Sequence, residues 1–189
     1  IVGKVVAHHL AHGGVSRFKK FRLYHKEFLG IYLTEQEVNE IAEKFSGLVM
    51  EKVIDAPCVK GAYEFLSDNH SNYDYYVSSG TPINEIKKIL NARQLSVFFN
   101  GIYGSPEGKD AHVKEIMENN KYDKEEVVFV GDALSDKKAA ESNSIIFIAR
   151  KSDDSTLFND NEKIISIRDL TELPAALKAI KEEQIDIIV

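Results

Sequence analysis

The chain has 189 residues, of which 43% are hydrophobic, enough for a packed core and for one average domain plus a smaller one. Lys and Arg total 24 against 30 Asp and Glu, and this net charge of -6 argues against a nucleic-acid or anionic-membrane partner. No apolar run approaches the roughly 18 residues of a membrane span. The one cysteine, Cys58, cannot form an intramolecular disulfide, so a cytoplasmic location is expected.

Residues 1 to about 46 have the apolar spacing of helices, and we expect three of them. Gly13-Gly14 separates the first helix from the second, and Thr34 followed by Glu37 is a capping-box signature that opens the third. The segment EKVIDAPCVKG is predicted to be a connector. The chain starts at Ile1 in a helical pattern, so we expect it to begin inside a longer protein.

After Pro57, apolar β-rich runs alternate with helical stretches. This rhythm predicts an α/β fold with a Rossmann-like parallel sheet and helices on both faces. Polar residues at the carboxyl ends of such strands are the first candidates for a binding site. The expected strands cover residues 73–78, 95–99, 127–131, 145–149 and 164–167, and the expected helices cover residues 83–92, 111–119, 173–180 and a stretch through Ala139-Ala140.

The stretch VVFVGDALSDKKAA is an apolar strand that runs into Asp132, with Asp136 four residues later. This spacing lets both carboxylates face one hard cation such as Mg²⁺. The alternative is structural: Asp136 caps a helix and Asp132 forms a turn.

The stretch YDYYVSSGTP is another apolar strand, and it ends in Ser78, Ser79, Gly80 and Thr81 before a helix that Pro82 can open. Hydroxyl groups and free backbone N–H groups at a helix N-terminus can bind a phosphate, although plain helix capping explains the same residues. Lys109 follows a Gly- and Pro-containing loop between these two segments.

These three segments, in this order, resemble motifs two, three and four of the haloacid dehalogenase-like phosphohydrolases, over most of residues 57 to 150. The resemblance implies that Ser78 and Lys109 hold the phosphoryl oxygens, with Ser79 and Gly80 beside them, and that Asp132 and Asp136 help to hold Mg²⁺. It also implies a helical cap over residues 1–54 and a core domain over residues 55–189.

The family's first motif is an Asp-x-Asp at the end of a central strand, and this sequence contains none. The nearest imitation, Asp186 in QIDIIV, lacks the second aspartate. We therefore expect the nucleophilic aspartate upstream of residue 1. The alternative is a non-catalytic binding relative that has lost this motif.

In the expected cap, HGGVSRFKKFR holds a basic cluster: Arg17, Lys19, Lys20 and Arg22. One interpretation is an amphipathic helix with a solvated basic face. The other is that His12 and Arg17, next to the Gly13-Gly14 turn, reach the active site and select the substrate. A metal site at His8, His9 and His12 is disfavoured because Mg²⁺ prefers oxygen ligands.

The resemblance implies an Mg²⁺-dependent phosphatase that hydrolyses a small phosphorylated metabolite through an aspartyl-phosphate. A phosphomutase of the β-phosphoglucomutase type has the same three motifs and remains an alternative. The GDxxxD pair favours phosphoryl transfer over carbon–halogen cleavage, because only the former requires a dianion and a cation to be held together.

Overall fold

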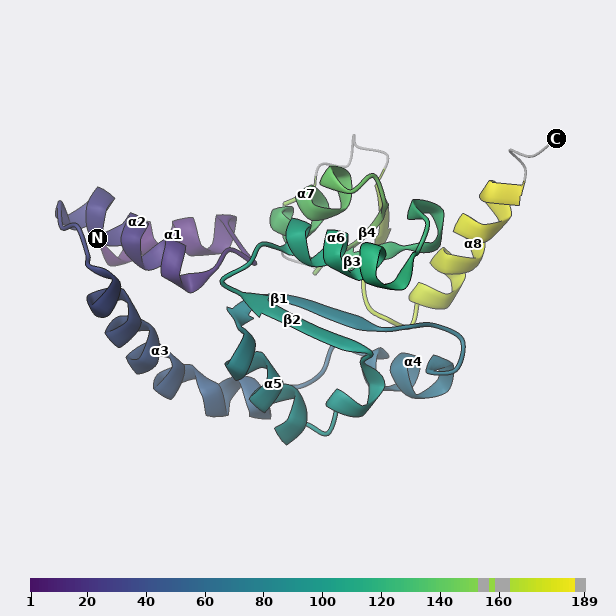
Figure 1. The fold of residues 1–189 in the computed structure, drawn as a ribbon, viewed down its shortest axis with the longest axis horizontal. Helices are drawn as coiled ribbons and strands as arrows, with labels where there is room; N and C mark the ends of the chain where they lie inside the picture. The colour runs from purple at the N-terminus through teal and green to yellow at the C-terminus, as the bar shows by residue number, and fades with distance from the viewer. Residues whose placement is uncertain (153–156, 159–163, 186–189) are drawn as a thin grey trace.

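The computed structural model describes residues 1–152, 157–158 and 164–185 (Figure 1). Three helices come first, as predicted: α1 (Val2–Ala11), α2 (Arg17–Leu29) and α3 (Glu35–Asp55). The capping box at the start of α3 is confirmed, since the Thr34 side chain accepts from the Glu37 N–H at 3.3 Å and Glu37 Oε2 accepts from the Thr34 N–H at 2.8 Å. These reciprocal bonds fix the first residue of α3.

The connector predicted over residues 51–61 is wrong in its first half, because α3 continues to Asp55. A short helix, α4 (Ala62–Asn69), then follows that the sequence analysis did not predict. It begins after Gly61, whose φ of 76° lies in the left-handed region that favours glycine. Its one buried residue is Phe65, which anchors α4 to the core.

The remainder alternates strands and helices, which confirms the α/β class. The strands are β1 (Tyr76–Pro82), β2 (Gly101–Ser105), β3 (Val128–Gly131), β4 (Ile146–Arg150) and β5 (Ile165–Ile167). The helices between and after them are α5 (Ile83–Ala92), α6 (Lys109–Asn120), α7 (Leu134–Ser142) and α8 (Leu173–Ile185), and single 3₁₀ turns cover Ser96–Phe98 and Lys124–Glu126. The strand predicted over residues 95–99 is wrong, because that run forms the first of these turns and the strand follows it as β2.

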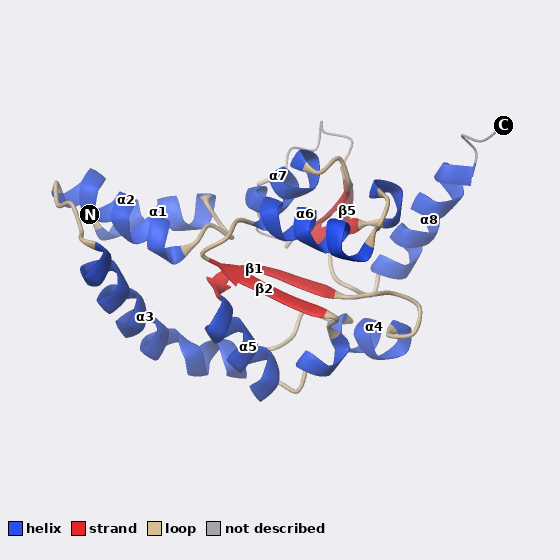
Figure 2. Cartoon of the chain, in the orientation of Figure 1, coloured by secondary structure: helices blue, strands red, loops and turns tan. Residues whose placement is uncertain are grey.

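The strands form two separate parallel sheets (Figure 2). One has the order β1-β2 and the other the order β3-β4-β5. Among the described residues β1 pairs only with β2 and β3 only with β4, so each of these two strands has one edge without a hydrogen-bonded strand. In Figure 1, β1 lies between β2 and the second sheet.

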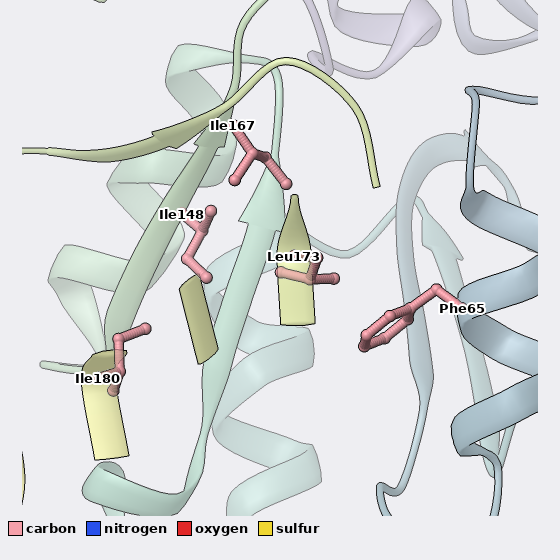
Figure 3. Close-up of a cluster of buried hydrophobic side chains, with 5 residues drawn as sticks. All are labelled: Phe65, Ile148, Ile167, Leu173 and Ile180. Carbon is pink, nitrogen blue, oxygen red and sulfur yellow. The ribbon is translucent and has the colours of Figure 1, made fainter. Parts of the chain in front are cut away.

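Alternating residues of β3 and β4 pack on opposite faces of the second sheet, as the two-residue period of a strand requires. Val128 and Ile148 belong to a core cluster with α4 and α8, drawn in Figure 3 through Phe65, Ile148, Ile167, Leu173 and Ile180. Phe129 and Phe147 pack instead against Val113 of α6 and Ala140 of α7. Helices therefore cover both faces, as predicted. None of the helices in the described part of the chain is long and apolar enough to cross a membrane.

Candidate functional site

Near the carboxyl ends of β1, β2 and β3 lies a group of residues that we call the rim: Ser79, Gly80, Lys109, Asp132 and Asp136. Ser79 and Gly80 belong to the end of β1, Lys109 opens α6, and Asp132 and Asp136 follow β3 in the turn and in the first turn of α7. Lys109 and Asp136 form a buried ion pair, with side chains 13% and 4% exposed. Asp136 Oδ2 also accepts from the backbone N–H groups of Asp132 at 3.2 Å and Ala133 at 3.0 Å. The Asp136 carboxylate thus closes the β3–α7 turn and fixes Lys109 at the same time.

Asp132 follows β3 directly and is exposed to solvent, whereas Asp136 is 3% exposed. Within the described residues, no group of three or more His, Cys, Asp or Glu side chains is arranged to hold a metal ion. Because Asp136 is already bound to Lys109, Asp132 is the rim carboxylate that remains accessible. One accessible carboxylate fits Mg²⁺, which usually keeps several waters and is bound by one or two carboxylates together with a substrate phosphate.

The two serines of β1 have different surroundings. Ser78 Oγ lies 2.9 Å from Nδ1 of His112, which is 2% exposed and whose pKa is lowered chiefly by burial. Ser79 lines a cavity together with Gly80, and its Oγ accepts from the Thr81 N–H at 3.1 Å. Of the two hydroxyls, the one at the cavity is therefore that of Ser79.

Two adjoining cavities of about 540 and 320 Å³ meet at the rim. Both are lined by Ser79, Gly80 and Lys109 of the rim and by Gly14 and Val15 of the α1–α2 turn. The turn and the rim are in close contact, because a Cβ added to Gly80 would lie 2.4 Å from the Gly14 carbonyl oxygen. Gly14 itself has φ of 70°, which glycine adopts without strain. Asp132 and Ser78 line neither cavity.

Arg17 lines the larger cavity, but its charge is already paired. Its guanidinium donates to both carboxylate oxygens of Glu85, at 2.7 and 2.8 Å, and also to Ser46 Oγ at 2.7 Å. Glu85 lies in the first turn of α5, the helix that follows Ser79 and Gly80. Arg17 therefore ties α2 and α3 to the rim, a positioning role that sequence reasoning did not foresee.

His12 does not line either cavity. It is the C-cap residue of α1, is exposed, and its Nδ1 lies 2.9 Å from the His8 carbonyl oxygen. Its ring stacks on that of His8 with centroids 3.9 Å apart. The structure thus brings Arg17 to the cavity and leaves His12 outside its wall.

The interpretation of the basic cluster as a solvated face is wrong for two members, since the Arg17 side chain is 12% exposed and Lys20 is only 5% exposed. Lys20 and Tyr24 are the two buried residues of α2. They lie four residues apart and so share one face of the helix. This spacing is the sequence signal that could have identified Lys20 as an inward-facing cation.

A model of the haloacid dehalogenase-like hydrolase family matches residues 16–150 of this chain. Comparison with curated protein sequences finds none that matches. Among solved structures, a predicted phosphatase from Clostridium acetobutylicum has a TM-score of 0.69 at 18% identity, with 89% of this chain and 78% of that chain covered.

Two further structures are similar in fold. A predicted phosphoglycolate phosphatase from Haemophilus somnus has a TM-score of 0.68 at 18% identity, covering 89% of this chain and 80% of that chain. The HAD-hydrolase YfnB from Bacillus subtilis, whose structure is bound to magnesium, has a TM-score of 0.66 at 18% identity, covering 94% of this chain and 79% of that chain. These likenesses agree with the family match on the fold.

Proposed function

Because the chain belongs to the haloacid dehalogenase-like hydrolase family, we propose that it is an Mg²⁺-dependent phosphatase that hydrolyses a small phosphorylated metabolite through an aspartyl-phosphate. The observation that carries this proposal is the rim itself. A fixed ammonium, a serine hydroxyl and a glycine backbone line the same cavity at the carboxyl end of a parallel sheet. Such an arrangement suits a phosphoryl group, whose oxygens need positive charge and hydrogen-bond donors.

In this proposal the phosphoryl oxygens are held by Lys109 Nζ, the Ser79 hydroxyl and the backbone next to Gly80. Asp136 acts indirectly, because its carboxylate fixes the Lys109 side chain against the β3–α7 turn. Ser78 lies outside the cavity lining, and its hydrogen bond with the buried His112 holds β1 against α6. The phosphate role that the resemblance assigns to Ser78 is thereby proposed for Ser79.

Asp132 is the residue proposed to hold Mg²⁺, and residues 1–54 are proposed to form the cap that covers the site. The ion, when bound, neutralises the phosphoryl oxygens and so allows a carboxylate to approach the phosphorus atom. Asp132 suits this role because it is the accessible carboxylate at the rim.

The proposed nucleophile is the first aspartate of an Asp-x-Asp motif that is not among the 189 residues. Two strand edges support this part of the proposal, namely the unpaired edges of β1 and β3 within the described chain. One additional parallel strand hydrogen-bonded to both would join the two sheets and would deliver its C-terminal residue to the rim. The coding sequence ahead of residue 1 should therefore encode an apolar strand ending in Asp-x-Asp.

The test is a phosphate-release screen over small phosphorylated metabolites, run with Mg²⁺ on the protein that carries this segment. We expect phosphate release from at least one monoester and its loss on addition of EDTA. Formation of an isomeric sugar phosphate without free phosphate would identify a phosphomutase instead. Tight binding of phosphorylated ligands without turnover, together with a coding sequence that lacks Asp-x-Asp, would identify a non-catalytic relative.

A further inference from the structure

Lys20 is a buried cation in the wall of the larger cavity. It extends from α2, is 5% exposed, and lies in that wall with His9 and Tyr24; we call these three residues the cap wall. Its ammonium approaches His9 Nδ1 at 3.3 Å and the His9 carbonyl oxygen at 3.5 Å, both long for hydrogen bonds. Among the described residues, no carboxylate forms an ion pair with Lys20, in contrast to Lys109 and Arg17.

An ammonium held away from water without an anion is unfavourable, because its lost hydration is not replaced. Burial accordingly lowers the pKa of Lys20. His9 cannot supply the missing negative charge, and its own pKa is lowered by burial and by Lys20. A cation in this state at a cavity wall is more typical of a binding site than of a structural element.

The cavity that holds Lys20 is also the cavity of the rim. Ser79, Gly80 and Lys109 line it together with the cap wall, and its volume of about 540 Å³ is within the range of small-ligand sites, roughly 300–1,000 Å³. Much of the remaining wall is apolar, formed by Val5, Val6, Leu10, Val15, Phe21 and Phe45. Arg17 adds no free positive charge, since Glu85 neutralises it.

We propose that the substrate is a phosphate monoester whose organic part carries a second anionic group, a carboxylate or a second phosphate, and that Lys20 binds this group. The proposal rests on the proposed function for the phosphate end and on Lys20 for the other end. A ligand of this kind places one anion at each of the two lysines and an apolar body against the wall between cap and rim. The same phosphate ester with a neutral hydroxyl in place of the second anion should bind worse.

The test uses phosphonates, which cannot be hydrolysed, so it does not require catalysis. A series of linear phosphonates with two to five methylenes is prepared with a terminal carboxylate, a terminal phosphonate or a terminal hydroxyl, and binding is measured by calorimetry with Mg²⁺. For at least one chain length we expect an anionic terminus to bind at least about tenfold more tightly than the hydroxyl, the effect of one charge-assisted contact. Whether the carboxylate or the second phosphonate binds better identifies the anion.

Two variants assign this preference to Lys20. Lys20→Met keeps the length of the side chain and removes its charge, so the preference should fall to less than about threefold. Lys26→Met removes one charge from the same helix at a side chain that is 55% exposed and outside the cavity, and it should leave the preference unchanged. Lys20→Met should also melt about 2 °C or more above the unmodified protein, because an unpaired buried charge is gone.

Equal binding of the anionic and hydroxyl ligands, binding of neither, or an unchanged preference in Lys20→Met would each overturn the proposal. Binding of neither ligand would also contradict the proposed phosphate site, whereas equal binding and an unchanged preference are distinct from failure of the proposed function. A preference that depends on Lys20 in a protein that releases no phosphate supports the anion site and contradicts the phosphatase. Phosphate release without any preference for a second anion supports the phosphatase and contradicts the anion site.

Discussion

Two lysines line the larger cavity, the buried Lys20 and the half-buried Lys109, and their ammonium groups have different partners. At the rim, Lys109 is paired with Asp136, whose carboxylate is fixed in turn by two backbone N–H groups. In the cap wall, Lys20 has two long contacts to His9 and no carboxylate within the described chain. The comparison teaches that burial alone does not define a lysine's role. In the two proposals above, the paired Lys109 is held in place to bind the phosphoryl group, and the unpaired Lys20 is available to a second anion.

Removal of the Lys109 charge should have the largest effect on the stability of the protein. Lys109→Met leaves Asp136 buried without its cation, and removal of one partner of a buried pair costs about 3 to 5 kcal/mol. We therefore expect a clear loss in the free energy of unfolding, measured by urea denaturation, whereas Lys20→Met stabilises the protein. A Lys109→Met variant as stable as the unmodified protein would contradict the assignment of this pair.

A second substitution provides the control. Asp136→Asn keeps an oxygen that can accept from the N–H groups of Asp132 and Ala133 but removes the charge. Combined with Lys109→Met it should recover most of the lost stability, because no unpaired charge then remains.

The next effect concerns the contact between the Gly13-Gly14 turn and Gly80 of the rim. A Cβ at position 80 would lie 2.4 Å from the Gly14 carbonyl oxygen, so Gly80→Ala must push the turn away. We expect a loss of about 1 to 3 kcal/mol, as for overpacking in a core, together with weaker binding of phosphonates.

The matched control is Gly47→Ala within α3, where an added Cβ meets nothing within 4 Å. There alanine should stabilise the helix, by up to about 1 kcal/mol. Thermal melts of the two variants should thus shift in opposite directions, and shifts of the same sign would show that the turn does not press against Gly80.

The smallest effect on folding and a specific effect on activity are expected from Asp132→Asn. Asp132 is exposed, so the melting temperature should stay within about 2 °C. Mg²⁺-dependent phosphate release should fall at least about tenfold, because an ion ligand is lost. Asp55→Asn, an exposed carboxylate at the end of α3, should leave release unchanged. Unchanged turnover in Asp132→Asn would remove this residue from the site.

The sequence predicts the order of the elements better than the details of each strand. The β2 sequence Gly-Ile-Tyr-Gly-Ser contains two glycines, which usually count against a strand. Both are explained by close neighbours: a Cβ at Gly104 would lie 2.6 Å from the Thr81 carbonyl oxygen, and one at Gly101 would lie 2.9 Å from the Tyr76 ring. Such approaches between β1 and β2 cannot be read before the pairing is known.

The choice of site residues also depends on contacts that the sequence alone does not show. Adjacent residues of a strand point to opposite sides, so the choice between Ser78 and Ser79 depends on a register of one residue. In the structure Ser78 is the serine that hydrogen-bonds to His112, a buried residue of α6 that comes 34 positions later. The pairing of Lys109 with Asp136 is likewise a contact between the first turns of two helices, α6 and α7. The motifs predict that these residues gather at one edge, and the packing of α6 decides which of them faces the cavity.

The proposed function requires that a phosphate and a divalent cation bind together at the rim. It is tested most directly by the phosphorus NMR signal of a bound phosphonate when Mn²⁺ replaces Mg²⁺, because a paramagnetic ion next to the phosphorus broadens that signal. We predict strong broadening in the unmodified protein and in Asp55→Asn, and its loss in Asp132→Asn. A signal that stays sharp in the unmodified protein, or that broadens equally in Asp132→Asn, would contradict the account.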